Sequence, residues 1–205
     1  MEFLPENVYH VFNQGNNREV IFRQEEDYLI FLRLLRKLIL PQCDLLAYCL
    51  MPNHFHLMIH TDERVAEFAK QGGLFLDPVT NGLRKLLSGY ARIFNKKYNR
   101  TGSLFRQKTK SKLLTDESIV VNATASVEDN CGNCFIYVHQ NPWKAGLVVM
   151  LEDWAYSSFR DFAGLRNGTL CNKEMAGKYC SFDLVEFRNL CGQEIKINFD
   201  TDFLR

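Results

Sequence analysis

The chain has 205 residues, of which 46% are hydrophobic and 13% aromatic, and its formal net charge is +1. This composition excludes an intrinsically disordered chain and suits one domain with a real core, with or without an appendage. No apolar run is long enough to span a bilayer, and the first residues lack the pattern of a secretory signal, so we expect a cytoplasmic protein. The seven cysteines, an odd number, are then expected to be reduced thiols.

The first half of the chain alternates between strand and helix patterns. Acidic residues at 25–27 precede apolar residues at helical spacing, which predicts a helix that Pro41 ends. We expect a loop with a short helix at 61–82. Strands are expected at residues 8–13, 44–50 and 54–60, the last two joined by a tight turn.

The second half begins with an amphipathic helix at 83–98 and a strand within 103–114. A polar insertion or mobile loop is expected at about 116–130, and a short helix at 134–140, closed by Asn141 and Pro142. The order is β-α-β-β-α-β followed by a helix. It predicts an α+β protein with the ferredoxin-like antiparallel sheet, two helices on one face, and an added helix able to cross the open face.

A pair of cysteines, Cys131 and Cys134, forms a C-x-x-C sequence. A zinc site needs two more ligands, and the sequence has no second C-x-x-C or H-x-x-x-H to supply them. We therefore expect an unpaired turn here.

Two histidines, His54 and His56, flank Phe55 on the third expected strand. Side chains alternate along a strand, so the two imidazoles share a face, about 7 Å apart at the Cα atoms, while Phe55 faces a core. That spacing allows both to bind one metal ion, although two such histidines are more often solvated or hydrogen-bonded.

The charge is unevenly distributed along the chain. The stretch 78–115 has ten basic residues and no Asp or Glu, so the rest of the chain is net negative. Four of these cations recur at every second residue of the expected strand 103–114 and would repel one another unless an anion lies against them. The pattern indicates a polyanion partner, most naturally a sugar-phosphate backbone. The four residues are Arg106, Lys108, Lys110 and Lys112.

Tyr137 and Asn141 are four residues apart and share one helix face. Tyrosine offers a phenolic nucleophile, and the asparagine amide offers a neutral oxygen to a metal. The same spacing is very common in helices with no such role.

Three stretches together resemble the single-tyrosine HUH transposases, in the branch associated with repetitive extragenic palindromes (REP). They are 48–56 (YCLMPNHFH), 90–106 (YARIFNKKYNRTGSLFR) and 137–146 (YVHQNPWKAG). The resemblance covers roughly residues 6–165. It predicts a transposase domain at 1–165, with the insertion at about 116–130, and an extension at 166–205 with no readable motif.

The resemblance implies a role for each matching residue. His54 and His56 match the histidines that bind a divalent metal ion, Mg²⁺ or Mn²⁺, and Asn141 matches the third ligand. Tyr137 matches the nucleophile, which attacks a single-stranded DNA phosphodiester and gives a 5′-phosphotyrosine and a free 3′-OH. Tyr90 and Tyr98 fit a helix core or a DNA-facing surface better.

The expected partner is single-stranded DNA with an imperfect hairpin, bound by a monomer or a homodimer. Phe105 and Trp143 are candidates to stack on an unpaired base, and a core role suits them equally. The expected phosphate-binding residues are Arg92, Lys96, Arg100, Arg106, Lys108, Lys110 and Lys112.

Three other functions remain open at this stage. A domesticated protein would bind or nick hairpin repeats without transposition. A non-catalytic RNA-binding ferredoxin-like module would need exposed aromatic residues where His54 and His56 lie. A metal-dependent hydrolase would need a carboxylate ligand or base, and none lies within the two motif segments.

Overall fold

A four-stranded antiparallel sheet forms the centre of the computed structural model, which describes residues 2–71, 73–115, 127–180, 187 and 191. The strand order is β2-β3-β1-β6, so the histidine strand β3 is central, as expected. Every pair of neighbours is antiparallel. The strands are β1 (Asn7–Gln14), β2 (Asp44–Met51), β3 (His54–Thr61) and β6 (Lys110–Leu113).

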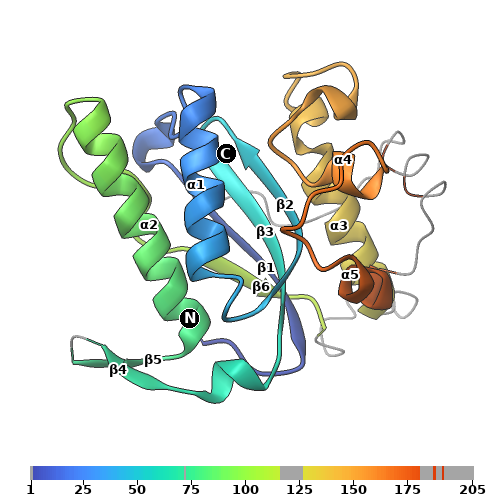
Figure 1. Ribbon diagram of the computed structural model, residues 1–205, viewed down its shortest axis with the longest axis horizontal. Helices are drawn as coiled ribbons and strands as arrows, with labels where there is room; N and C mark the ends of the chain where they lie inside the picture. The colour runs from blue at the N-terminus through green and yellow to red at the C-terminus, as the bar shows by residue number, and fades with distance from the viewer. Residues whose placement is uncertain (1, 72, 116–126, 181–186, 188–190, 192–205) are drawn as a thin grey trace.

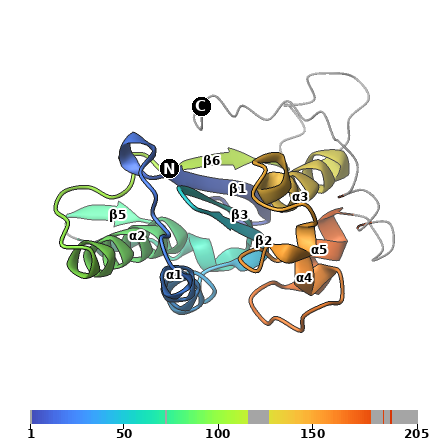
Figure 2. The same ribbon diagram turned by 90° about the horizontal axis from the view of Figure 1, so that it is seen from above.

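Helices cover both faces of this sheet (Figures 1 and 2). On one face lie α1 (Glu25–Leu38) and α2 (Pro78–Lys97). On the other lie α3 (Val127–Lys144), α4 (Phe159–Phe162) and α5 (Lys173–Cys180). The expected βαββαβ order and the added helix on the open face are therefore confirmed. Short 3-10 helices occur at η1 (Asn16–Arg18), η2 (Glu63–Ala66) and η4 (Leu151–Asp153).

Strand alternation divides the interior into two cores. Phe55, Leu57 and Ile59 of β3 enter the core under α1 and α2, whereas Met58 enters the core under α3 and α5. Helices α1 and α2 pack closely against each other, because a Cβ atom at Gly82 of α2 would lie 2.6 Å from the Leu38 carbonyl oxygen of α1. Among the described residues no helix is both long and apolar enough to cross a membrane.

Residues 61–82 differ from the expected loop. They hold the β4–β5 hairpin, formed by β4 (Ala69–Gln71) and β5 (Leu74–Leu76). Helix α2 also begins earlier than its apolar spacing predicts. Asp77 caps it by accepting a hydrogen bond from the Thr80 N–H, and Pro78 is tolerated in the first turn.

The expected strand at 103–114 is wrong over most of its length, because only Lys110–Leu113 pair as β6. The preceding residues are bound by the Asn13 side chain, which donates to the Arg106 carbonyl oxygen and the Thr109 hydroxyl. Arg106 and Lys108 therefore lie in a loop, and the four cations do not share one strand face.

The expected short helix at 134–140 is also wrong in its bounds, since α3 runs from Val127 to Lys144 with Pro142 inside it. A proline here removes one backbone hydrogen bond with only one turn of helix remaining. Cys131 and Cys134 are thus buried helical residues and not a turn. Of the expected insertion, 116–126 lies outside the described residues.

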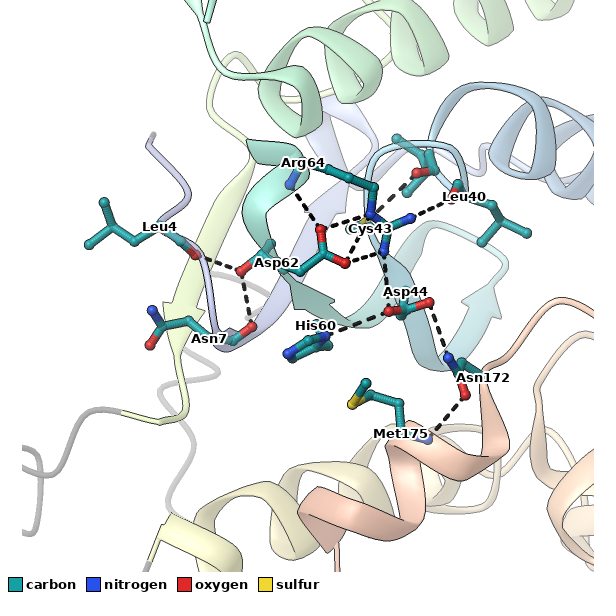
Figure 3. A network of polar contacts seen from close by, with 12 residues as sticks. Leu4, Asn7, Leu40, Cys43, Asp44, His60, Asp62, Arg64, Asn172 and Met175 are labelled. Carbon is teal, nitrogen blue, oxygen red and sulfur yellow. Dashed lines mark hydrogen bonds and ion pairs between the residues drawn. The ribbon is translucent and has the colours of Figure 1, made fainter. Parts of the chain in front are cut away.

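The described part of the C-terminal extension packs against the sheet and α3. Asn172 donates to the Asp44 carboxylate, and its side-chain oxygen accepts from the Met175 N–H. Asp44 also pairs with Arg64, which binds the Asp62 carboxylate, as Figure 3 shows. This network ties α5 to the ends of β2 and β3. The boundary at residue 165 stays a prediction, as does a separate role for the extension.

Candidate functional site

His54 begins β3, directly after the turn at Pro52 and Asn53. Its ring Nδ1 lies 2.6 Å from the Asn53 side-chain oxygen. An amide oxygen only accepts, so His54 Nδ1 must carry the proton and Nε2 must hold the lone pair. Nε2 is buried and has no hydrogen-bond partner among the described residues.

His56 lies two residues on, fully buried, with its ring perpendicular to that of His54 and 5.0 Å from it, centre to centre. Its Nδ1 lies 2.9 Å from Nε2 of His10 on β1. The two rings are nearly parallel, at 17°. Nε2 of His56, like that of His54, has no hydrogen-bond partner within the described part of the chain.

Helix α3 brings Tyr137 over these rings. The Tyr137 ring is edge-on to His56 at 5.5 Å and to His10 at 5.9 Å. One turn later, Asn141 donates from Nδ2 to the Tyr137 carbonyl oxygen at 2.8 Å. Its side chain also interacts with both His54 and His56, although it makes no hydrogen bond to either Nε2 in the described structure. The residues singled out from the sequence at 54, 56, 137 and 141 thus meet in one cluster.

Burial controls protonation in this cluster. Loss of solvation lowers the pKa of His54 to about 4 and the pKa of His56 well below its usual value, and the Asn141 side chain opposes both shifts only in part. Burial, helped by the charge of Lys112, lowers the pKa of His10 to about 3. The three rings are neutral at pH 7, as metal ligands and hydrogen-bond acceptors must be. Burial also raises the pKa of Tyr137 to about 12, so its phenol keeps its proton.

These side chains fit a divalent metal ion. Two buried imidazole nitrogens, Nε2 of His54 and of His56, have no hydrogen-bond partner among the described residues, and the Asn141 side chain interacts with both rings. Within the described residues no group of three or more His, Cys, Asp or Glu side chains is placed to hold a metal. A metal ion held by these residues would therefore need the asparagine amide and oxygen atoms supplied by a substrate or by water.

Comparisons with known proteins point in the same direction as the sequence motifs. No family model matches the chain. A Haemophilus influenzae protein named as a REP-associated tyrosine transposase is 28% identical over 116 residues, which are 55% of this chain and 57% of that protein. Over this stretch the chain is similar to a REP-associated tyrosine transposase. It matches little more than half the length of this curated relative.

One solved structure shares the fold. The structure of a REP-associated tyrosine transposase bound to a REP hairpin superposes with a TM-score of 0.56, at 16% identity, over 84% of this chain and 92% of that chain. A bacterial tRNA(His) guanylyltransferase-like protein in complex with GTP reaches a TM-score of only 0.45 at 9% identity, over 72% of this chain and 67% of that chain. The second value is too low to support an inference.

Several cations gather around one groove of this protein. The groove, of about 700 Å³, lies between α2, the β4–β5 hairpin and the 103–110 loop, and no acidic residue lines it among the described residues. Leu76, Leu83 and Leu87 contribute apolar lining. The basic residues that line it are Arg84, Arg106, Lys108 and Lys110.

Lys112 extends this basic surface toward the histidines, since it pairs across the strands with His10, while Lys110 pairs with Phe12. Arg84 is not among the residues predicted from the sequence to bind DNA. Its place becomes visible only with the β4–β5 hairpin, which forms the other wall of the groove.

The remaining predicted phosphate-binding residues lie elsewhere. Arg92 lines a separate depression between α1 and α2, and Lys96 is exposed at the end of α2. The Arg100 guanidinium binds the Glu19 carboxylate, with Nε 2.8 Å from one oxygen, and so has a structural role in this state. Their contact with DNA stays a prediction.

The other aromatic residues considered as nucleophiles or as base-stacking groups pack within the fold or form hydrogen bonds in it. Tyr90 and Phe105 are buried in the core under α1 and α2, and the Tyr98 hydroxyl donates to Asp27 at 2.7 Å. Trp143 is partly buried and lines an apolar pocket beside η4.

Three histidines had no assigned role in the sequence, and His10 is the one that joins the cluster. Strand alternation on β1 predicts which face of the sheet His10 lies on. It does not predict the contact with His56, because His56 belongs to a different strand. His139 donates to the Phe135 carbonyl oxygen and contacts the Ser158 hydroxyl, so it links α3 to the neighbouring chain. His60 lies 3.6 Å from Asp44.

Proposed function

We propose that this chain is a transposase-type nuclease and strand transferase that cleaves single-stranded DNA with Tyr137 as the nucleophile. The observation that supports this is the convergence of Tyr137, Asn141, His54 and His56, from α3 and β3, on one face of the sheet. The relationship to REP-associated tyrosine transposases supports the same class of reaction.

The reaction exchanges one phosphodiester for another. The Tyr137 oxygen forms a bond to phosphorus, the bond from phosphorus to the 3′ oxygen breaks, and the leaving 3′ oxygen takes a proton. The products are a 5′-phosphotyrosine and a free 3′-OH, and reversal on a second 3′-OH joins strands without ATP. Because burial holds the Tyr137 pKa at about 12, the phenol must lose its proton during attack.

His54, His56 and Asn141 are the residues that would hold the metal ion. The two Nε2 atoms and the asparagine oxygen provide neutral donors, and Mg²⁺ or Mn²⁺ suits a phosphate substrate. When bound, such an ion polarises the scissile phosphate and neutralises developing charge. The described chain contributes no carboxylate to this set, which favours transfer of the DNA strand to Tyr137 over the metal-dependent hydrolase alternative.

The site described here is closed. Tyr137 is 8% exposed and His56 is fully buried, so a phosphodiester reaches the tyrosine only after α3 shifts or its surroundings open. We infer that substrate binding and opening are coupled. Under this proposal, the protein acts in the cytoplasm as a monomer or a homodimer.

The basic groove and Lys112 are the proposed path for the DNA. Cations line the groove beside an apolar wall, which suits phosphates together with unpaired bases. The path leads along the edge strand β6 to the histidine cluster. The proposed substrate is single-stranded DNA with an imperfect hairpin, from an insertion sequence or repetitive palindrome.

The test is a covalent-adduct assay on labelled single-stranded hairpin DNA from the genomic flank, with Mg²⁺ or Mn²⁺. We expect a protein–DNA adduct that requires metal and disappears in Tyr137→Phe and His54→Ala. Tyr98→Phe is the matched control, because that phenol hydrogen-bonds to Asp27 far from the cluster. An adduct that survives Tyr137→Phe would overturn the assignment, and tight binding without cleavage of any flank would favour a non-catalytic DNA-binding protein.

A further inference from the structure

The two proposed metal ligands share an arrangement that their sequence motif does not contain. In each ring Nδ1 contacts a fixed partner, while Nε2 is buried without one in the described structure. For His54 the partner is an amide oxygen, so its tautomer is already decided. For His56 the partner is a second imidazole, which can either donate or accept.

Geometry limits the His10–His56 contact to one shared proton. A nitrogen–nitrogen distance of 2.9 Å is a hydrogen bond, and two neutral rings form it only if one nitrogen carries the proton and the other does not. If His10 donates, the His56 proton must sit on Nε2. If His10 accepts, His56 Nε2 is left with a lone pair.

The surroundings of His56 Nε2 distinguish these two states. A buried N–H without an acceptor is rarer and more costly than a buried lone pair without a donor. The Asn141 side chain interacts with the His56 ring but makes no hydrogen bond to Nε2 in the described structure. A proton on Nε2 would therefore lack an acceptor in hydrogen-bond geometry, and it is better placed on Nδ1. With its proton on Nδ1, His56 has the same tautomer as His54, and both rings hold a lone pair on Nε2.

We propose that His10 is a positioning residue whose Nε2 accepts the Nδ1 proton of His56, holding the His56 lone pair on Nε2 for a divalent metal ion. This role rests on the proposed function for its purpose, though not for its geometry. Partners of this kind fix the ring orientation of metal-binding histidines, and their loss typically weakens metal binding by about 10- to 100-fold. Asn53 does the same for His54, so each ligand has its own support.

Long-range proton–nitrogen NMR of the metal-free, full-length protein reads the tautomer directly. We expect the His56 proton on Nδ1 in the wild type. A His56 proton on Nε2 would overturn the proposal. This measurement needs neither metal nor DNA, so it stands even if the proposed function fails.

Mn²⁺ affinity, followed by electron paramagnetic resonance, measures the consequence. His10→Leu removes the acceptor and should weaken Mn²⁺ binding at least 10-fold, whereas His10→Gln supplies an oxygen acceptor and should stay within about 3-fold of the wild type. His60→Gln is the matched control, a buried histidine on the same face of β3 that contacts Asp44 and not His56.

Thermal unfolding separates folding from positioning, because only variants with native-like unfolding are compared. Equal Mn²⁺ affinity in folded His10→Leu and wild type would overturn the proposal. Wild-type protein whose Mn²⁺ binding does not depend on His54 would instead contradict the metal site of the proposed function, and the NMR result would still decide the role of His10.

Discussion

The two faces of the sheet differ in what they bury. Under α1 and α2 the core is aliphatic and aromatic, and polar groups at its edge are paired, as Asp77 is with the start of α2. All five histidines of the chain lie on the α3 side, and Nε2 of His54 and of His56 has no hydrogen-bond partner in the described structure. The comparison indicates that one face supplies stability, while the other keeps polar groups ready for a ligand.

The sharpest test of this division is Tyr137→Phe. We expect the rate of DNA cleavage to fall at least about 1,000-fold, because the nucleophilic oxygen is lost. The free energy of unfolding should change by less than about 1 kcal/mol, since the ring still packs on His10 and His56. Single-turnover cleavage and urea unfolding measure the two effects. If Tyr137→Phe also lowered the free energy of unfolding well beyond this limit, the α3 face would contribute to stability as well.

Phe55→Ala should show the reverse pattern. Phe55 is fully buried against Phe31 on the α1 side, so its truncation should cost about 3–5 kcal/mol of unfolding free energy. The adjacent His56→Leu should cost less than about 1.5 kcal/mol while abolishing metal-dependent cleavage. Urea unfolding of both variants tests this, and an equal loss of stability would remove the contrast between faces.

Acid should destabilise the α3 face selectively. Burial lowers the pKa of His139 to about 3, whereas the unfolded chain takes up this proton near pH 6.5. The unfolded state therefore binds more protons below pH 6.5, and stability falls as the pH drops toward 4.5. His139→Gln should reduce the slope of unfolding free energy against pH by about 1.4 kcal/mol per pH unit, measured in EDTA. An unchanged slope would show that His139 does not stay neutral in the fold.

The smallest effect is expected in the basic groove. Lys108→Ala removes one exposed cation from its lining, so DNA affinity should fall a few-fold and the salt dependence of binding should decrease by about one ion. Binding isotherms at several salt concentrations measure both. Lys173→Ala, an exposed cation at the start of α5, is the control and should change neither. Equal effects of the two changes would argue against this groove as the path of the DNA.

Sequence periodicity was sufficient where one face of an element is apolar. The alternation around Phe55 correctly placed His54 and His56 on the face opposite the main core, and the four-residue spacing placed Asn141 beside Tyr137. Both predictions depend only on local backbone geometry. Their chemical roles stay predictions.

Tertiary contacts decided what periodicity could not. The cations at 106 and 108 alternate like a strand, but Asn13 binds that segment as a loop. Pro142 signals a helix end, yet α3 continues past it for a short final stretch. His10 gave no local signal, because its partner His56 is 46 residues away and in diagonal register.

Helix α3 carries Tyr137 and Asn141 one turn apart, and the Asn141 amide is hydrogen-bonded to the Tyr137 backbone. The separation between phenol and amide is therefore set by helix pitch and not by the packing of α3 on the sheet. A displacement of α3 moves both groups away from His54 and His56 together. Tyr137 and Asn141 on α3 therefore form one half of the cluster, and the histidines of the sheet form the other. The complete site is assembled in one step when α3 docks on the sheet.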